Sequence, residues 1–443
     1  MRRIYEDHGY GEGPVAGCYW DTTVARPART PPISGEATAE VAVIGAGYTG
    51  LSAALHLART GVDVAVMEAE GVGWGASGRN GGFVCLGGAK ASDAALTRRF
   101  GTEAMAGWHA AQKASVALVA DLLEQHGIAA DIHSEQGETM VAHRPRDFAE
   151  FRDEAAALAH AYGVRVDVIG PSELSGEGLA GPGFHGALRL PIGFAFNPLK
   201  YVLGLAAAAR DAGARIFESS SVTAIRREGA RYVLEGAQGQ LIAGKLILAT
   251  NGYSSDDLPD WMAGRYLPAQ SAVLVTRELS EGEIAAQGWT SDGMAYDTRN
   301  LLHYFRLMPN RCFLFGMRGG TRAGPSAQRD MQRRIRTDFE AMFPAWAEVE
   351  TPHFWSGFVC LARGLRPYVG PLGDWPDAWA GFAWHGNGVA LGTYAGRLLA
   401  GLATGQAGVP ALMAAPPERF PFGRFRRLLL PAAYAWYGLS DRG

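Results

Sequence analysis

Residues 41–67 read VAVIGAGYTGLSAALHLARTGVDVAVM. The first four, 41–44, are a short apolar strand, and 62–67 form a second buried strand. Between them, 49–60 has the apolar spacing of a packed helix. The order predicts a β-α-β unit, the building block of a parallel sheet covered by helices.

The turn of this unit carries a Gly-x-Gly-x-x-Gly run, Gly45, Gly47 and Gly50. The first glycine permits the tight turn, the second lets backbone approach a pyrophosphate, and the third allows close packing of helix on strand. Glu68 closes the second strand, where an acid accepts hydrogen bonds from ribose hydroxyls. A glycine-rich turn without a ligand is the alternative, and the combination of strand, glycines and acid disfavours it.

Residues 71–82, GVGWGASGRNGG, contain too many glycines for a regular element. Their backbone is able to lie against a flat ring, with Ser77, Arg79 and Asn80 as hydrogen-bonding groups. Such a segment favours an elongated cofactor that continues past the pyrophosphate, FAD rather than NAD. A flexible solvent loop is the alternative, because Gly/Ser runs are often only loops.

Composition excludes several classes of protein. The chain has 443 residues, 48% of them hydrophobic, and its 41 Lys+Arg against 44 Asp+Glu leave a formal net charge of −3, which disfavours nucleic-acid binding. The amino terminus lacks the apolar core of a secretory signal, and no apolar run is long enough to span a bilayer, so we expect a soluble, cytoplasmic protein. The four cysteines, Cys18, Cys85, Cys312 and Cys360, are too far apart for a metal site or a disulfide framework.

The pattern along the chain predicts two intertwined domains after an irregular arm that reaches residue 39. We assign 37–135, 195–260 and 355–443 to an FAD-binding domain, and 136–194 and 261–354 to a substrate-binding domain. Further helices are expected at 91–126, 198–213, 326–343 and within 381–405, and further strands at 138–141, 214–217, 222–225, 232–234, 245–249, 272–278 and within 301–316.

Residues 43–58 followed by 75–82 resemble the D-amino-acid-oxidase-like family of FAD-dependent oxidoreductases, and most closely its members that oxidise γ-glutamylputrescine. The likeness runs almost from end to end. It includes 197–198, 249–253, 304–306, 355–357, 367–370, 385–388 and 421–424.

The resemblance implies an α/β fold, in which a Rossmann-like FAD-binding domain is interleaved with a mixed-sheet α+β substrate domain. It implies FAD as the cofactor, bound noncovalently because the spacing from Cys360 to Pro367 and Gly370 agrees with that branch of the family. The implied cofactor-binding residues are Gly45, Gly47, Tyr48, Thr49, Gly50, Glu68, Ala69, Ala76, Ser77, Arg79, Asn80, Gly81, Gly82, Val222, Asn251, Gly252, Gly386, Asn387, Gly388 and Val389.

Four side chains are candidate catalytic or anchoring groups: His385, Tyr304, Arg306 and Arg363. His385 lies inside a cofactor-associated motif, although a histidine bound to backbone is a common structural outcome. An arginine meets a carboxylate with two parallel hydrogen bonds, so Arg306 or Arg363 is predicted to anchor a substrate carboxylate with Tyr304 beside it. A surface salt bridge is the alternative for each arginine.

Other residues near these motifs leave the substrate open. Arg318 and Arg366 are further possible carboxylate clamps, and Trp384 and Phe305 are possible aromatic walls or ordinary core. Ala362 stands where close relatives have threonine.

The predicted activity is FAD-dependent oxidation of a C–N bond in a small amine or amino acid, with a γ-glutamylputrescine-like substrate favoured. A hydride passes to flavin N5, and water hydrolyses the imine to an aldehyde or keto acid. The rival is a dehydrogenase of the D-amino-acid or taurine type, which passes electrons to a quinone or a partner protein instead of oxygen. A noncatalytic FAD-binding module is a third reading. Residues 425–430, FRRLLL, are basic and then apolar, and we expect them to pack as a terminal segment without membrane contact.

Overall fold

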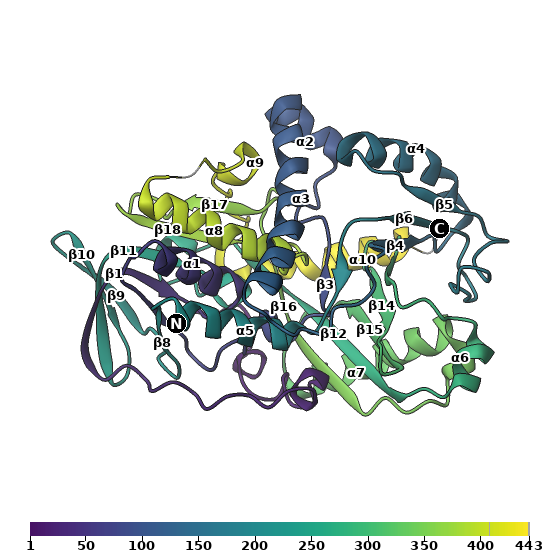
Figure 1. The fold of residues 1–443 in the computed structure, drawn as a ribbon, viewed down its shortest axis with the longest axis horizontal. Helices are drawn as coiled ribbons and strands as arrows, with labels where there is room; N and C mark the ends of the chain where they lie inside the picture. Colours follow the sequence, from purple (N-terminus) through teal and green to yellow (C-terminus); the bar gives the residue numbers. More distant parts are fainter. Residues whose placement is uncertain (407, 442–443) are drawn as a thin grey trace.

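The computed structural model describes residues 1–406 and 408–441. Two eight-stranded sheets form the two halves of this part of the chain (Figure 1). The chain crosses between the halves several times, because each sheet takes strands from separate stretches of sequence.

The first sheet has the order β17-β18-β11-β1-β2-β8, with a hairpin of β9 and β10 beside β11. Strands β2, β1, β11 and β18 run parallel, with β8 parallel to β2 at the edge. The bounds are β1 Gly35–Ile44, β2 Val64–Met67, β8 Arg215–Phe217, β9 Ala224–Glu228, β10 Arg231–Glu235, β11 Gly239–Leu248, β17 Tyr368–Pro371 and β18 Ala378–Phe382.

Two strands of this sheet differ from the sequence prediction. β1 begins at Gly35, because residues 35–39 pair in parallel with β11 although their side chains are mostly exposed. An apolar pattern does not reveal such an extension. The strand expected at 222–225 begins at Ala224, where pairing with β10 starts.

Helices α1 (Tyr48–Arg59), α5 (Pro198–Asp211) and α8 (Ala390–Thr404) pack together on the first sheet (Figure 1). Small residues let α1 and α8 approach closely. A Cβ at Gly396 of α8 would lie 2.4 Å from the carbonyl oxygen of Thr49 in α1. The close packing places the amino terminus of α1 beside the start of α8.

The second sheet has the order β16-β12-β15-β14-β13-β4-β6-β5 and is mostly antiparallel. Its bounds are β4 Glu138–Val141, β5 Asp167–Ile169, β6 Ala187–Leu190, β12 Leu267–Glu278, β13 Met294–Asp297, β14 His303–Leu307, β15 Cys312–Arg318 and β16 His353–Leu361. The position of β16 in this sheet differs from the domain division expected from the sequence, which assigned residues from 355 onward to the FAD-binding domain. β16 pairs with β12 along nine residues, from His353 to Leu361.

The remaining elements cover the sheets or connect them. The helical region expected at 91–126 is two helices, because Gly101 adopts a φ of 86° between them. The bounds are α2 Asp93–Phe100, α3 Thr102–Gln125, α4 Pro145–Tyr162, α6 Glu281–Gln287, α7 Pro325–Met342, α9 Ala411–Ala414 and α10 Leu429–Ser440, with a small sheet of β3 Phe83–Val84 and β7 Phe194–Ala195. Within the described ranges, no helix is long and apolar enough to cross a membrane.

Candidate active site and cofactor channel

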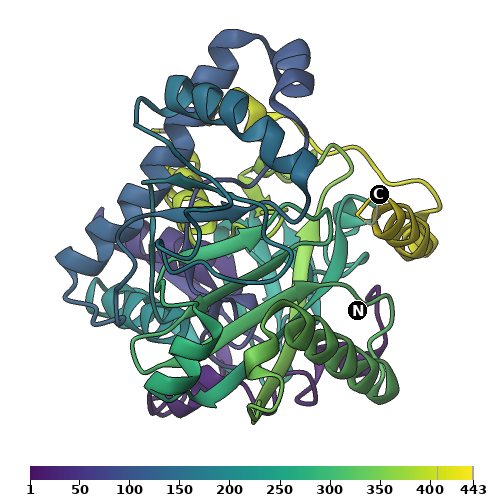
Figure 2. The ribbon, with the colours of Figure 1, turned by 90° about the vertical axis from the view of Figure 1, so that its right-hand side faces the viewer.

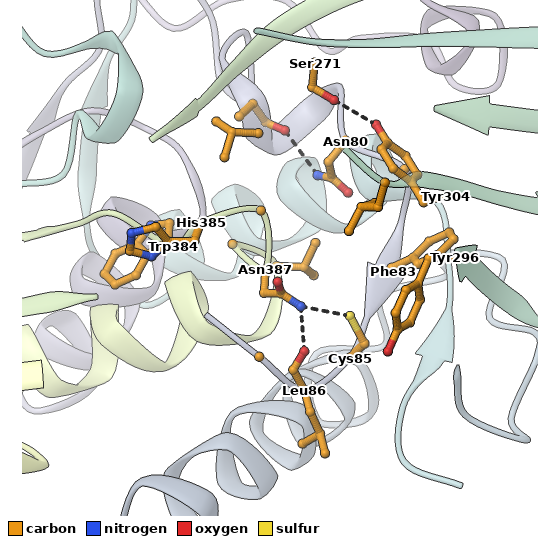
Figure 3. Close-up of a pocket in the computed structure, with 18 of the residues that line it drawn as sticks. Asn80, Phe83, Cys85, Leu86, Ser271, Tyr296, Tyr304, Trp384, His385 and Asn387 are labelled. Atoms are coloured by element: carbon orange, nitrogen blue, oxygen red, sulfur yellow. Dashed lines mark hydrogen bonds between the residues drawn. The ribbon is translucent and has the colours of Figure 1, made fainter. Parts of the chain in front are cut away.

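A cavity of about 500 Å³ lies where the two sheets meet. Its walls come from α1, the 76–90 segment, strands of the second sheet and the 384–389 loop before α8. Figure 3 shows Trp384 and His385 on one side of this cavity, and Phe83, Tyr296 and Tyr304 on the other. The cavity is therefore built from both halves of the molecule.

The glycine turn at the start of α1 has no room for side chains. Gly45 has a φ of 104°, and a Cβ there would lie 3.0 Å from the carbonyl oxygen of Ala249. A Cβ at Gly47 would lie 2.8 Å from Ser77 Oγ, and one at Gly50 would lie 1.9 Å from the carbonyl oxygen of Gly45. The turn thus leaves backbone exposed at a helix amino terminus, the geometry that receives a phosphate.

Glu68 holds this turn from the end of β2. Its carboxylate accepts hydrogen bonds from the backbone N–H of Ala46 at 2.7 Å and of Glu70 at 3.0 Å. Burial raises the pKa of Glu68 above its usual range. Glu68 lies where the sequence analysis expected the acceptor of the ribose hydroxyls, and its two hydrogen bonds also hold the glycine turn in place.

A second cavity of about 150 Å³ continues from the first on the side of Glu68. Gly45, Ala69 and Val222 line it. Four residues line both cavities: Gly47, Ala76, Ala249 and Asn251. The two spaces form one elongated channel past the amino terminus of α1, which fits a dinucleotide with a flat ring at its far end.

The polar side chains of the 71–82 segment fold that segment. Asn80 Nδ2 donates to Tyr48 Oη and to the carbonyl oxygens of Ala76 and Ser77, while its Oδ1 accepts from the Gly82 N–H at 2.8 Å. These bonds direct the segment's backbone along the channel.

Arg79 uses its guanidinium in the same way. It donates to the carbonyl oxygens of Gly75 and Ser356 and to Tyr253 Oη. The indole of Trp355 donates to the Arg79 carbonyl oxygen at 2.8 Å. Arg79 therefore ties the segment to β16 of the second sheet.

His385 is held by backbone on both ring nitrogens. Its Nδ1–H donates to the Gly88 carbonyl oxygen at 2.9 Å, and its Nε2 accepts from the Ala362 N–H at 3.1 Å. Burial lowers its pKa to about 4. The ring is neutral with no free lone pair, so this arrangement gives His385 a positioning role and not the catalytic role that we expected.

Asn387 fixes the same loop to the 85–88 segment (Figure 3). Its Nδ2 donates to the Leu86 carbonyl oxygen at 2.5 Å and lies 3.3 Å from Cys85 Sγ. A Cβ at Gly87 would lie 2.7 Å from that Nδ2 atom. The loop of residues 384–389 thus closes onto the channel with its backbone.

The ring of Tyr304 forms part of the cavity wall and packs against two glycines. A Cβ at Gly81 would lie 2.8 Å from its ring, and a Cβ at Gly316 would lie 2.1 Å from it. Tyr304 Oη is 3.2 Å from Ser271 Oγ (Figure 3). The phenol consequently faces the cavity between the two sheets.

The two arginines predicted to anchor a carboxylate lie outside the cavity. Arg306 is fully buried, donates to the Phe196 carbonyl oxygen and to His133 Nε2, and has its pKa lowered to about 9 by burial. Arg363 is exposed, donates to the Arg419 carbonyl oxygen and pairs with Glu418 at 3.5 Å. These contacts correct the expected role of both residues.

Arg366 is also occupied elsewhere. It donates to the carbonyl oxygens of residues 412, 415 and 416, which belong to α9 and the segment after it. It therefore serves the packing of that segment.

Three cations lie on the cavity wall, Arg79, Arg318 and Lys90, and the Arg79 guanidinium is already engaged by protein oxygens. Arg318 Nη2 donates to the His385 carbonyl oxygen at 2.8 Å. The positive charge of Arg318, followed by burial, lowers the pKa of Lys90 to about 7. Because the two positive charges repel each other, the space next to them favours the binding of an anion. The sequence analysis considered Arg318 but did not identify Lys90. The glycine pair shortly before Lys90 was the only hint in the sequence that this segment lies near a ligand.

A buried carboxyl group faces the same space. Glu138 lines the cavity, and burial raises its pKa to about 8. Met140, Leu188 and Leu190 continue the wall from Glu138 as an apolar surface. The cavity thus combines cations, a carboxyl group that is mostly neutral at pH 7, and room for an alkyl chain.

Three predicted cofactor residues support the channel from outside its wall. Gly50 packs under the turn, Gly82 lies against the Phe196 carbonyl oxygen, and Gly252 packs on Phe358. The other predicted residues on the walls are Tyr48, Thr49, Ser77, Arg79, Asn80, Gly81, Gly386, Gly388 and Val389.

The chain is similar to known proteins over nearly its whole length. A family model described as FAD dependent oxidoreductase matches residues 40–402. A probable oxidoreductase OrdL of Rhizobium meliloti (strain 1021) is 31% identical over 97% of this chain and 99% of its own length. Gamma-glutamylputrescine oxidoreductase of Escherichia coli (strain K12) is 30% identical over 91% of this chain and 93% of its own length.

Solved structures share the fold at lower identity. Glycine oxidase from Geobacillus kaustophilus has a TM-score of 0.66 at 19% identity, over 84% of this chain and 96% of that one. Iminodiacetate oxidase from Chelativorans sp. BNC1 has a TM-score of 0.64 at 19% identity, over 85% of this chain and 100% of that one.

Proposed function

The chain belongs to the family of FAD-dependent oxidoreductases, and from that premise we propose that its substrate is a small amine that carries a carboxylate at the end away from the oxidised carbon. The coarser activity is established by the family: an FAD-dependent oxidation of amines or amino acids. The proposal of a carboxylate-bearing substrate rests on one observation: two cations, Arg318 and Lys90, line the same cavity and repel each other.

The residues of the channel fit FAD. Gly45, Gly47 and the amino terminus of α1 would receive the pyrophosphate, and Glu68 the adenosine ribose. The 76–82 segment and the 386–389 loop would flank the ring. When bound, the flavin supplies the acceptor for the hydride that leaves the carbon next to the amine nitrogen.

The protein's own contribution is to position the amine and keep it dry. Tyr304, Trp384 and Phe83 surround the space with aromatic surface, which favours the neutral, reactive form of the amine. Arg318 and Lys90 would hold the carboxylate and so fix the distance of the reacting carbon from the ring. Water then hydrolyses the C=N bond of the imine product, which gives an aldehyde or keto acid and releases the nitrogen as ammonia or an amine.

The part of the cavity wall that contains Glu138 favours a substrate with an amino-acid head group. Glu138 and Lys90 line the same cavity and interact electrostatically, so an ammonium next to a carboxylate bound by Lys90 would favour ionisation of the Glu138 carboxyl group. The apolar stretch of Met140, Leu188 and Leu190 accommodates methylene groups. A γ-glutamylputrescine-like molecule has these parts, in agreement with the name of the relative from Escherichia coli.

Anaerobic bleaching of the flavin tests the proposal. The holoenzyme is mixed with γ-glutamylputrescine and, separately, with a putrescine amide of equal length that lacks the carboxylate and the α-amino group. We expect rapid bleaching with the first and much slower bleaching with the second. Equal rates with both amides would refute carboxylate recognition. Reoxidation by oxygen or by a soluble quinone, followed in the same cuvette, then identifies the electron acceptor.

A further inference from the structure

The C-terminal segment exposes a large apolar surface. Among the described residues, seven large hydrophobic side chains are exposed, and five of them lie between residues 422 and 439. These five, Phe422, Phe425, Leu428, Trp436 and Leu439, form what we call the C-terminal apolar face. The sequence predicted a packed terminal segment at 425–430. Arg426 and Leu430 of this segment are buried, whereas Phe425 and Leu428 are 55% and 68% exposed.

Helix geometry places these side chains on one continuous stripe. Phe425 and Leu428 are three residues apart in the 3₁₀-helix Gly423–Leu428, where positions i and i+3 lie on the same side, and Phe422 directly precedes that helix. In α10, Trp436 follows Leu428 by two four-residue steps and Leu439 follows three residues later. The stripe continues from one helix to the next.

The opposite side of α10 is anchored to the protein. Leu430 is buried, and Tyr434 packs with it in a cluster that includes Tyr5 and Phe358. No residue from 428 to 440 is charged. Figure 2 shows α10 at the margin of the molecule, apart from the two sheets. The helix is thus fixed on one side and apolar on the side that faces outward.

Unpaired arginines flank the apolar face. Arg426 binds Asp256 in the interior, and Arg427 pairs with Glu6. Arg419 and Arg424 are exposed, and within the part of the chain that the structure describes neither has a carboxylate in ion-pairing distance. The Arg424 guanidinium lies over the Phe425 ring, 4.6 Å from its centroid. Two exposed cations without a carboxylate partner therefore lie at the amino-terminal end of the apolar stripe.

We propose that the C-terminal apolar face docks on an anionic lipid surface. Exposed Phe, Leu and Trp beside arginine is the composition of an interfacial helix that lies in the plane of a bilayer. Trp436 has the amphipathic ring that prefers the headgroup level, and Arg419 and Arg424 are attracted to anionic headgroups. A second copy of the chain is the alternative occupant of this face, and the light-scattering measurement below distinguishes the two. The proposal does not rest on the proposed substrate.

Vesicle cosedimentation of the holoenzyme tests it. We expect binding to phosphatidylcholine vesicles that contain a third phosphatidylglycerol, weaker binding to phosphatidylcholine alone, and release by salt. Trp436→Ser with Leu439→Ser removes apolar surface, and Arg419→Glu with Arg424→Glu reverses the charge. Each pair of changes should lower partitioning by about tenfold or more.

Matched controls are Ile132→Ser, an exposed apolar residue elsewhere, and Arg98→Glu on α2, both expected to bind like the parent protein. The flavin spectrum and melting temperature establish that each variant is folded. Absence of binding to anionic vesicles would overturn the proposal, as would binding that survives both pairs of changes. A dimer measured by light scattering and abolished by Trp436→Ser with Leu439→Ser, without vesicle binding, would also overturn it and assign the face to self-association.

Discussion

The guanidinium of Arg318 donates from Nη2 to the carbonyl oxygen of His385 at 2.8 Å, and this bond joins β15 of the second sheet to the loop that closes the channel in front of α8. A Cβ at Gly386 would lie 2.1 Å from the same nitrogen, so the loop has to carry glycine there. Arg318 is thus both a wall of the cavity and a tie between the two halves of the molecule.

Replacement of Arg318 by methionine should raise the Michaelis constant for a carboxylate-bearing amine by about 10- to 200-fold, because a charge-assisted hydrogen bond is worth about 1.5–3 kcal/mol. The constant for an amine without a carboxylate should change little. Steady-state kinetics with both substrates check this, with Arg363→Met as the control because Arg363 lies outside the cavity. Equal losses with both substrates would mean that Arg318 acts through the closing loop alone.

Lys90 should give carboxylate recognition a pH dependence near 7. The lysine is protonated below its pKa of about 7, so attraction for a carboxylate is greatest at lower pH and falls as the pH rises through 7. The amine's own titration is removed by taking the ratio of kcat/KM for the carboxylate substrate to that for its neutral analogue. This ratio should fall between pH 6 and 8, and Lys90→Arg should flatten it. A slope that persists in Lys90→Arg assigns the titration to another group.

Substitution of Glu68 by arginine should lower the FAD content of the purified protein without creating affinity for NADP. The change removes the acceptor of the Ala46 and Glu70 N–H groups and places a cation where ribose hydroxyls require an acceptor. Absorbance of flavin per chain measures the effect. Glu36→Arg, at an exposed position of β1, is the matched control. Full flavin content in Glu68→Arg would contradict the assignment of the ribose site.

Acid precipitation should release FAD into the supernatant. Cys360 lines the cavity, and burial raises the pKa of its thiol to about 12, so little of the thiolate needed for attachment forms at neutral pH. Cys360→Ser should release the same amount of flavin. A yellow pellet that loses its colour in Cys360→Ser would show a covalent bond.

His385 should make the protein less stable in acid. The unfolded chain takes up a proton near pH 6.5, whereas the folded ring does so only near pH 4, so the free energy of unfolding falls as the pH drops through this interval. Melting temperatures between pH 7.5 and 5 measure the loss. In His385→Gln the part of the pH dependence of the melting temperature that comes from this histidine should disappear. At pH 7.5 the variant should already melt at a lower temperature, because the substitution disturbs two buried backbone hydrogen-bond partners. An unchanged pH dependence in that variant would place the acid sensitivity elsewhere.

The glycine turn before α1 and the acid at the end of β2 were predictable because their requirements are local. Gly45 has a positive φ, and a Cβ there would lie 3.0 Å from a backbone oxygen, so the turn favours glycine. Glu68 follows the buried β2 by sequence spacing alone. The first β-α-β unit, most helices and the separate second sheet follow from the same kind of periodicity.

Which arginine faces the cavity was not predictable, and strand pairing explains why. Tyr304 pairs with Gly316 and Arg306 with Leu314 in the β14–β15 ladder, so Tyr304, Arg306 and Arg318 share one face of the sheet. Trp20 from the amino-terminal arm and the Phe196 carbonyl oxygen cover Arg306, whereas Arg318 meets the open cavity. By itself the sequence determined the family, and with it the cofactor class, and it determined the glycine turn before α1, because backbone sterics act between near neighbours. Only the tertiary structure decided which cations face the cavity and which apolar side chains remain exposed, because the segments that cover them arrive from distant parts of the chain.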